Sequence, residues 1–147
     1  MACIHVEGKD SHKLLNYCFT RDISDLAVGR CVYGAFLSED GYCIDDAIVY
    51  KLSDRLFMVC VNAGMGAAIA GILRDQGAFM EISIDDLSER LGKMDIQGIN
   101  SALILKKLIQ KPEIVFNKMP YFSFKGCVKD GLYSKVPEVR QIGRASC

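Results

Sequence analysis

Two adjacent carboxylates, Asp45 and Asp46, interrupt a run of residues that otherwise favours a β-strand. The run 41–51 reads GYCIDDAIVYK, and Ile, Val and Tyr are enriched in strands whereas Asp is depleted there. Side chains alternate between the two faces of a strand, so Asp46, Ile48 and Tyr50 share one face and Asp45 lies on the other. An acid, a branched apolar side chain and an aromatic ring in line can form one wall of a ligand site. Its carboxylate would accept hydrogen bonds from a flat ring that carries N–H groups.

The neighbouring strands offer two more candidates for this wall, Tyr33 before the paired acids and Asn62 after them. The alternative interpretation is that Asp45 and Asp46 lie near a hairpin end in contact with solvent, and that Tyr50 belongs to the core. Strand geometry alone leaves both interpretations open.

The elements that would position these residues follow one another as β-α-β-β-β-α-β. This order predicts an α+β, ferredoxin-like domain over residues 1–92, a split βαβ arrangement with one extra strand. An Asp-Gly pair at 40–41 predicts a tight hairpin turn, and Asp10 or Ser11 is expected to cap the first helix. The expected strands are 3–8, 30–37, 42–52, 56–62 and 78–84, and the expected helices lie within 9–23 and over 64–77.

Residues 93–147 predict an incomplete second α+β region, with a boundary near Gly92. A short strand is expected before a helix over 99–111, which Pro112 should stop. Two further strands are expected within 119–127 and 131–141, joined by a turn at Asp130-Gly131.

Composition excludes several classes of function. The 147 residues include 18 basic and 18 acidic side chains without a basic run, which argues against a nucleic-acid partner. No apolar run approaches the roughly 18 residues of a membrane span. The seven cysteines are odd in number and lack the spacing of a zinc site, so reduced thiols in the cytoplasm are expected, with Cys127 and Cys147 the most accessible.

A glycine pair, Gly64 and Gly66, follows a strand and opens a helix, with Asp85 further on. This resembles part of a dinucleotide-binding fingerprint. The third glycine should stand at position 69, where Ile69 is found instead, and Gly71 is displaced. A glycine-rich helix start is the favoured interpretation.

The sequence around the paired acids resembles the aminomethyltransferases, the T-protein family of the glycine cleavage system. The segment SEDGYCIDDAIVYKLSDRLFMVCVNAG is similar to the family's NEDGG-I-DD-L-VY strand and the VVNA strand that follows it. The segments NYCFTRDISDLAVGRCVY, MDIQGINSALIL and MPYFSF resemble further family segments in the same order. A weaker likeness extends to folate-dependent demethylases and to folate-binding proteins of iron–sulfur assembly.

The resemblance implies tetrahydrofolate-dependent one-carbon transfer and gives roles to individual residues. It implies that Asp46 is the essential acid and that Tyr33, Ile48, Tyr50 and Asn62 line the tetrahydrofolate pocket. In the family, an aminomethyl group carried on the lipoyl arm of a carrier protein passes to tetrahydrofolate, and ammonia leaves. A lipoyl carrier protein is therefore the implied partner, and no metal is expected.

The chain departs from the family pattern at both ends. It begins at a Met that matches the end of the family's DVSHM segment, and RQIGRASC stands where RTGYTGEDGFE is expected. These departures predict a truncated family member with weak folate affinity that self-associates through exposed strands. The alternatives are a non-catalytic folate- or partner-binding module, a folate-dependent demethylase, or an iron–sulfur assembly relative.

Overall fold

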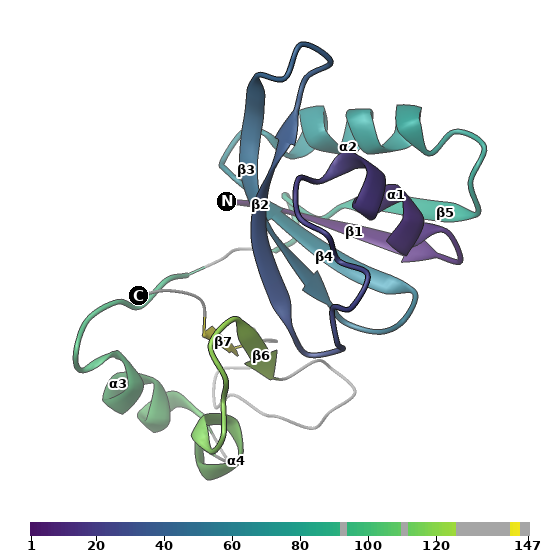
Figure 1. Cartoon of the computed structure of the whole chain (residues 1–147). Helices are drawn as coiled ribbons and strands as arrows, with labels where there is room; N and C mark the ends of the chain where they lie inside the picture. The colour runs from purple at the N-terminus through teal and green to yellow at the C-terminus, as the bar shows by residue number, and fades with distance from the viewer. Residues whose placement is uncertain (92–93, 110–111, 126–141, 145–147) are drawn as a thin grey trace. The chain divides into compact units, whose positions relative to one another are not determined.

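The computed structural model describes residues 1–91, 94–109, 112–125 and 142–144 (Figure 1). The chain divides into two compact units, Met1–Lys93 and Met94–Cys147. The boundary expected near Gly92 falls outside the described residues. Every residue of the candidate wall belongs to the first unit.

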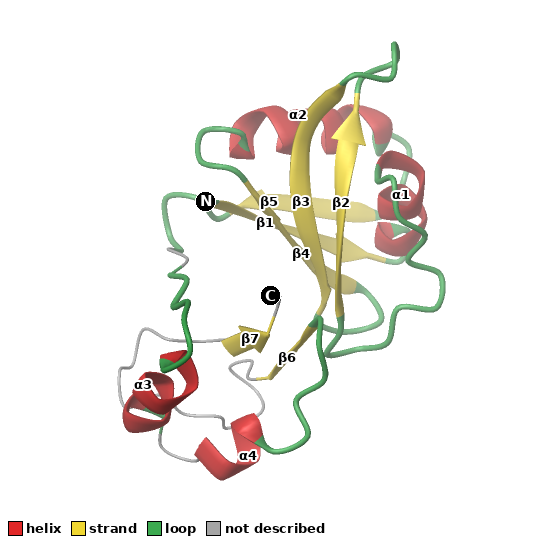
Figure 2. Ribbon diagram, turned by 60° about the vertical axis from the view of Figure 1, so that its left-hand side comes forward, coloured by secondary structure: helices red, strands yellow, loops and turns green. Residues whose placement is uncertain are grey.

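The first unit is a five-stranded antiparallel sheet in the order β2-β3-β4-β1-β5, with two helices on one of its faces (Figure 2). Its α+β composition and its order of elements agree with those predicted from the sequence. The elements are β1 (Ala2–Gly8), α1 (Ser11–Cys18), β2 (Cys31–Leu37), β3 (Cys43–Lys51), β4 (Leu56–Val61), α2 (Gly66–Gln76) and β5 (Ile82–Asp86).

The core lies between the helices and one face of the sheet. Ile4 and Val6, alternate residues of the interior strand β1, are fully buried and pack in the same cluster as Leu14 of α1 and Leu73 of α2. Each such side chain stabilises the fold by about 1.5–3 kcal/mol relative to an exposed position. Cys18 of α1 is half-buried against this cluster.

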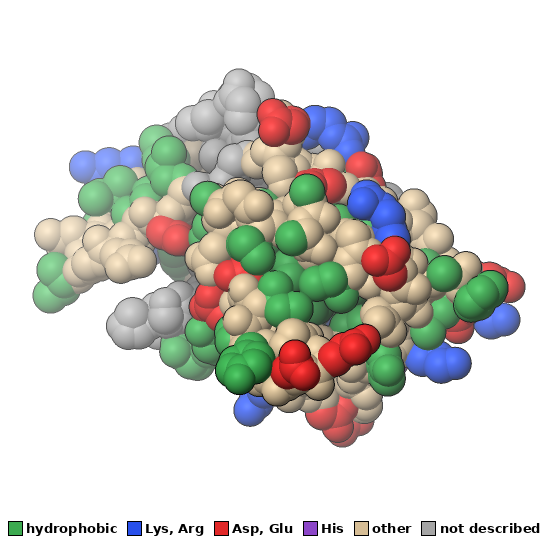
Figure 3. Space-filling model, turned by 90° about the horizontal axis from the view of Figure 1, so that it is seen from above, with side chains coloured by type: hydrophobic (Ala, Val, Ile, Leu, Met, Phe, Trp, Pro, Cys, Tyr) green, Lys and Arg blue, Asp and Glu red, His purple; other side chains and the backbone are tan. Residues whose placement is uncertain are grey.

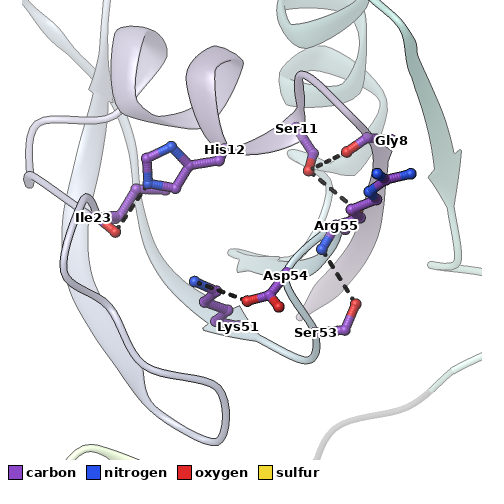
Figure 4. A network of polar contacts seen from close by, with 8 residues as sticks. All are labelled: Gly8, Ser11, His12, Ile23, Lys51, Ser53, Asp54 and Arg55. Atoms are coloured by element: carbon purple, nitrogen blue, oxygen red, sulfur yellow. Dashed lines mark hydrogen bonds and ion pairs between the residues drawn. The ribbon is translucent and has the colours of Figure 1, made fainter.

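The start of α1 is hydrogen-bonded to the turn between β3 and β4 (Figure 4). The hydroxyl of Ser11 donates to the carbonyl oxygens of Gly8 at 2.8 Å and of Arg55 at 3.1 Å. Asp10 occupies the N-cap position, but its carboxylate accepts the backbone N–H of Glu81 instead of capping the helix. The expected side-chain cap by Asp10 or Ser11 is therefore wrong, and both side chains connect separate segments.

The strand expected over 78–84 begins only at Ile82. The chain turns first, and the backbone N–H of Met80 donates to the carbonyl of Gly77, where α2 ends. Gly77 has a φ of −95°, so no left-handed conformation demands a glycine. A Cβ there would lie 2.2 Å from Cδ1 of Ile82, and close packing of helix end against strand explains the residue.

The glycines that resemble part of a dinucleotide fingerprint serve the turn into α2. Gly64 has a φ of +85°, in the region that favours glycine. A Cβ on Gly66 would stand 2.6 Å from the hydroxyl of Ser88 and 2.9 Å from the Cβ of Ala2. Gly66 therefore lets the helix start approach β1 and the segment after β5.

Replacing Gly66 by Ala is expected to lower the free energy of unfolding by about 1–3 kcal/mol, because the added methyl group overpacks this contact. Gly71 is the matched control in the same helix, since a Cβ there would meet nothing within 4 Å. Gly71→Ala should raise stability by about 0.5–1 kcal/mol. Urea denaturation followed by circular dichroism measures both, and equal shifts in the two variants would contradict the packing explanation.

The second unit contains α3 (Ser101–Leu108), α4 (Pro112–Phe116), β6 (Ser123–Lys125) and β7 (Ile142–Arg144), with β6 and β7 antiparallel. Pro112 opens α4, a position that suits it because the first helical N–H has no partner within the helix. The described part of the expected short strand, residues 94–98, contains no strand. The expected strand over 131–141 and the Asp130-Gly131 turn lie outside the described residues.

Within the part of the chain that the structure describes, no helix is long and apolar enough to cross a membrane. Over the same residues, no cluster of His, Cys, Asp and Glu side chains could hold a metal ion. Hydrophobic, acidic and basic side chains are interspersed on the face seen in Figure 3. The described cysteines carry thiols and not disulfides, and Cys127 and Cys147 lie outside the described residues.

Candidate functional site

The two acids of β3 point to opposite faces of the sheet. Ala47 and Val49 are buried in the core under the helices, and Asp45 shares their face. Asp46 and Ile48 lie on the opposite face and are half-buried. The structure therefore has the alternation that the strand pattern predicts.

Asp46 is held by hydrogen bonds from both neighbouring strands. The hydroxyl of Tyr33 donates to Oδ2 of Asp46 at 2.7 Å, and Nδ2 of Asn62 donates to Oδ1 at 2.6 Å. Tyr33 stands opposite Ile48 in the β2–β3 ladder, and Asp46 stands opposite Ala35. Tyr33 and Asp46 are thus diagonal neighbours on one face, a spacing that a long aromatic side chain bridges.

Asp45 holds Asn62 in place, a role that the strand pattern does not predict. Its side chain is buried, at 8% exposure. Oδ2 accepts the backbone N–H of Asn62 at 2.9 Å, and Oδ1 accepts Nδ2 of the same residue at 2.7 Å. A buried carboxylate requires such partners, and the Asn62 amide consequently bridges both acids. The sequence feature that could have indicated a buried, hydrogen-bonded Asp45 is its position on the same strand face as the core residues Ala47 and Val49.

The hydrogen bonds fix the protonation of the pair at neutral pH. The Tyr33 hydroxyl, followed by the Asn62 amide, lowers the pKa of Asp46 below its ordinary 3.8. The same bond to Asp46 raises the pKa of Tyr33 above its ordinary 10. Asp46 is therefore a carboxylate and Tyr33 a neutral phenol over the physiological range.

Tyr33→Phe is expected to move the pKa of Asp46 upward, toward 3.8, because the phenol is the largest cause of its lowering. The carboxyl carbon resonance of Asp46, followed by NMR over an acid titration, measures the change. Tyr42→Phe alters an exposed tyrosine near the hairpin tip and should leave the Asp46 titration where it is. An unchanged Asp46 pKa in Tyr33→Phe would show that the bond does not persist in solution.

The remaining predicted residues continue the same face of β3. Ile48 stands opposite Tyr33 on β2 and Cys60 on β4, and Tyr50 follows one row further along, opposite Cys31. Tyr50 is buried, whereas half of the Tyr33 side chain is exposed. The structure thus joins Tyr33, Asp46 and Asn62 by hydrogen bonds, places Ile48 beside them, and puts Tyr50 beyond Ile48.

This arrangement presents an ionised acceptor next to an apolar and aromatic surface. Each oxygen of Asp46 accepts one hydrogen bond from the protein and keeps capacity for a second donor. The site can therefore bind a flat group that carries N–H donors, and it can stabilise positive charge that develops nearby.

Comparison with known proteins identifies the family of this chain. The family model described as the GCVT N-terminal domain matches residues 1–136. An aminomethyltransferase of Oceanobacillus iheyensis is 34% identical over 130 residues, which are 87% of this chain and 34% of that protein. An aminomethyltransferase of Corynebacterium aurimucosum is 30% identical over 125 residues, 84% of this chain and 34% of that one.

A solved structure extends the likeness to three dimensions. The glycine cleavage system aminomethyltransferase T from Bartonella henselae superposes with a TM-score of 0.57 at 29% identity. The match covers 59% of this chain and 24% of that one. Fold and sequence thus place the molecule in one class, the aminomethyltransferase-related proteins. The chain belongs to the GCVT N-terminal domain family, and it spans about a third of the length of the curated relatives it matches.

Proposed function

We propose that the first unit binds tetrahydrofolate on the sheet face that carries Asp46, and that it does so for aminomethyl transfer. The observation that carries the proposal is the hydrogen-bonded group of Tyr33, Asp46 and Asn62 in a member of this family. The named relatives are aminomethyltransferases, which supports the choice of reaction class.

The donors and acceptors present suit a reduced pterin ring. Such a ring is flat and carries N–H groups, for which the Asp46 carboxylate is the matching acceptor. Ile48 supplies apolar contact in the adjoining row, and Tyr33 presents an aromatic ring on the same face. Tyr50 extends the wall beyond Ile48 along β3.

Tetrahydrofolate, when bound, supplies the nucleophilic nitrogen that accepts the one-carbon unit. The side chains of this chain would bind and orient it. Asp46 accepts from the ring and stabilises positive charge that develops on its nitrogen, while Tyr33 and Asn62 hold the carboxylate in place. Asp45 would act indirectly, because it holds Asn62, which in turn donates to Asp46.

We also propose that residues 1–92 form a ferredoxin-like domain, which is followed by a second α+β region. Strands β4 and β5 are connected through α2 and flank β1, which supports the split βαβ description. A lipoyl carrier protein is the proposed donor partner, by analogy with glycine cleavage proteins.

The openness of this wall sets the expected strength of binding. Pockets usually enclose roughly 70–90% of a drug-sized ligand, whereas Tyr33 on this wall is 51% exposed. Water beside Asp46 would weaken a charge contact from about 4 to about 1 kcal/mol. We therefore expect a dissociation constant in the high micromolar range.

Calorimetric titration of the 147-residue chain with tetrahydrofolate under anaerobic conditions tests the proposal. Saturable heat that disappears in Asp46→Asn but persists in Tyr42→Phe is the expected result. Absence of saturable heat, or the same heat in Asp46→Asn, would overturn it.

A second candidate is a non-catalytic module that binds folate or a partner chain. The observation in its favour is that Tyr33 on the candidate wall is 51% exposed, which leaves a ligand on this wall open to water. The two candidates differ in an ammonia-release assay with the loaded carrier, because only the enzyme accelerates that release.

A further inference from the structure

Two cysteines face each other across the central strands. Sγ of Cys3 on β1 and Sγ of Cys60 on β4 lie 3.3 Å apart, joined by an S–H···S hydrogen bond. The two residues are direct partners in the antiparallel ladder, and both are buried. Neither forms a disulfide.

The backbone geometry of such a pair suits a disulfide. Directly opposed residues of antiparallel strands have Cα atoms about 4.5–5.5 Å apart, and disulfides usually span about 4.4–6.8 Å between Cα atoms. The two sulfur atoms need to approach by only about 1.3 Å to reach bonding distance. A rotation of side chains can supply this approach while the β1–β4 ladder stays paired.

We propose that Cys3 and Cys60 form a reversible thiol–disulfide site that links β1 to β4 when the protein meets hydrogen peroxide. The thiolate of one cysteine attacks a peroxide oxygen, which gives a sulfenic acid and, after protonation of the leaving hydroxide, one water. The second thiol attacks the sulfenic sulfur, the S–S bond forms, and a second water leaves. Two thiols are oxidised and one peroxide is reduced to two waters.

The contact between the two sulfurs favours this pair over the other cysteines. The reacting species is a thiolate, and the S–H of the partner can donate to that thiolate and stabilise it. Both thiols are buried, so the oxidant has to be a small molecule, as hydrogen peroxide is. Cys43 is exposed but faces Leu37 across its ladder, and Cys31 faces Tyr50.

Peptide mapping of the full chain tests the proposal directly. The protein is exposed to graded hydrogen peroxide, the remaining thiols are alkylated with iodoacetamide, and the digest is analysed by mass spectrometry. The expected product links the peptides that contain Cys3 and Cys60, is lighter by about two mass units, and disappears with dithiothreitol. The link should also raise the unfolding temperature, because it closes a loop that holds α1, β2 and β3.

Matched variants separate this pair from the rest of the chain. Cys60→Ser should abolish both the linked product and the thermal shift, and Cys60→Ala replaces it if the buried hydroxyl prevents folding. Cys18→Ser should retain both. Two results would overturn the proposal. One is that Cys3 and Cys60 are still alkylated, and therefore still thiols, at a peroxide dose that oxidises the exposed Cys43. The other is that Cys3 or Cys60 is linked to a different cysteine.

Discussion

Asp46→Asn is expected to weaken tetrahydrofolate binding by about ten- to a hundredfold. A hydrogen bond to a charged group contributes about 1.5–3 kcal/mol, and each 1.4 kcal/mol corresponds to about a tenfold change in affinity. The variant loses the negative charge that accepts from the ring, while an amide of nearly the same shape keeps the site filled. Calorimetry at one pH and one salt concentration compares the variant with the wild type.

Asp45→Asn is the matched control, since the two acids are adjacent in sequence and lie on opposite faces. It should lower the free energy of unfolding by about 1–3 kcal/mol, because the new amide cannot accept both Asn62 bonds. Its effect on tetrahydrofolate affinity should be the smaller of the two. Equal losses of affinity in both variants would refute the assignment of the two faces.

The strand pattern was sufficient to predict which acid faces the candidate wall. Side chains in a strand alternate regardless of which strand lies beside it, so Asp46 could be separated from Asp45 without knowledge of the neighbours. The glycine-rich helix start also predicted a helix over 64–77, and α2 spans Gly66–Gln76. These features depend only on residues close together in the chain, so they can be predicted from the sequence.

The partnership of Asp45 and Asn62 could not be predicted in the same way. It depends on the register of β3 against β4. In this register Ala47 pairs with Val61, so Asn62, the residue after Val61, lies beside both acids. No local signal sets that register. The late start of β5 has a similar cause, because Phe79 and Met80 favour a strand while packing at Gly77 imposes a turn. Tertiary contacts override strand propensity at such positions.

Asn62→Asp tests the bridge between the acids most severely. The Asn62 amide donates to Oδ1 of Asp45 at 2.7 Å and to Oδ1 of Asp46 at 2.6 Å. A carboxylate of the same shape would replace both attractions by repulsion between like charges, with Asp45 buried. The free energy of unfolding at pH 7 should fall by about 3–5 kcal/mol, the range for breaking a buried ionic contact.

The pH dependence of Asn62→Asp gives the sharper result. Three crowded carboxylates raise one another's pKa in the folded protein above the unfolded value of about 4. The folded state then binds more protons than the unfolded state between about pH 7 and pH 4, so stability rises as the pH falls through this window. The wild-type contribution of Asp46 has the opposite sign, because its folded pKa is lowered and its stabilisation is lost only below the ordinary 3.8.

Asn62→Ala separates lost hydrogen bonds from added charge. It should cost about 1–3 kcal/mol and show no gain in stability on acidification, since the alanine brings no third carboxylate to the two acids. Urea denaturation of the three proteins at several pH values between about 4 and 7 measures both effects. If Asn62→Asp lost no more stability than Asn62→Ala at pH 7, or failed to recover on acidification, the amide would not bridge Asp45 and Asp46 in solution. The hydrogen bonds that hold Asp46 toward its proposed ligand would then have to come from Tyr33 alone.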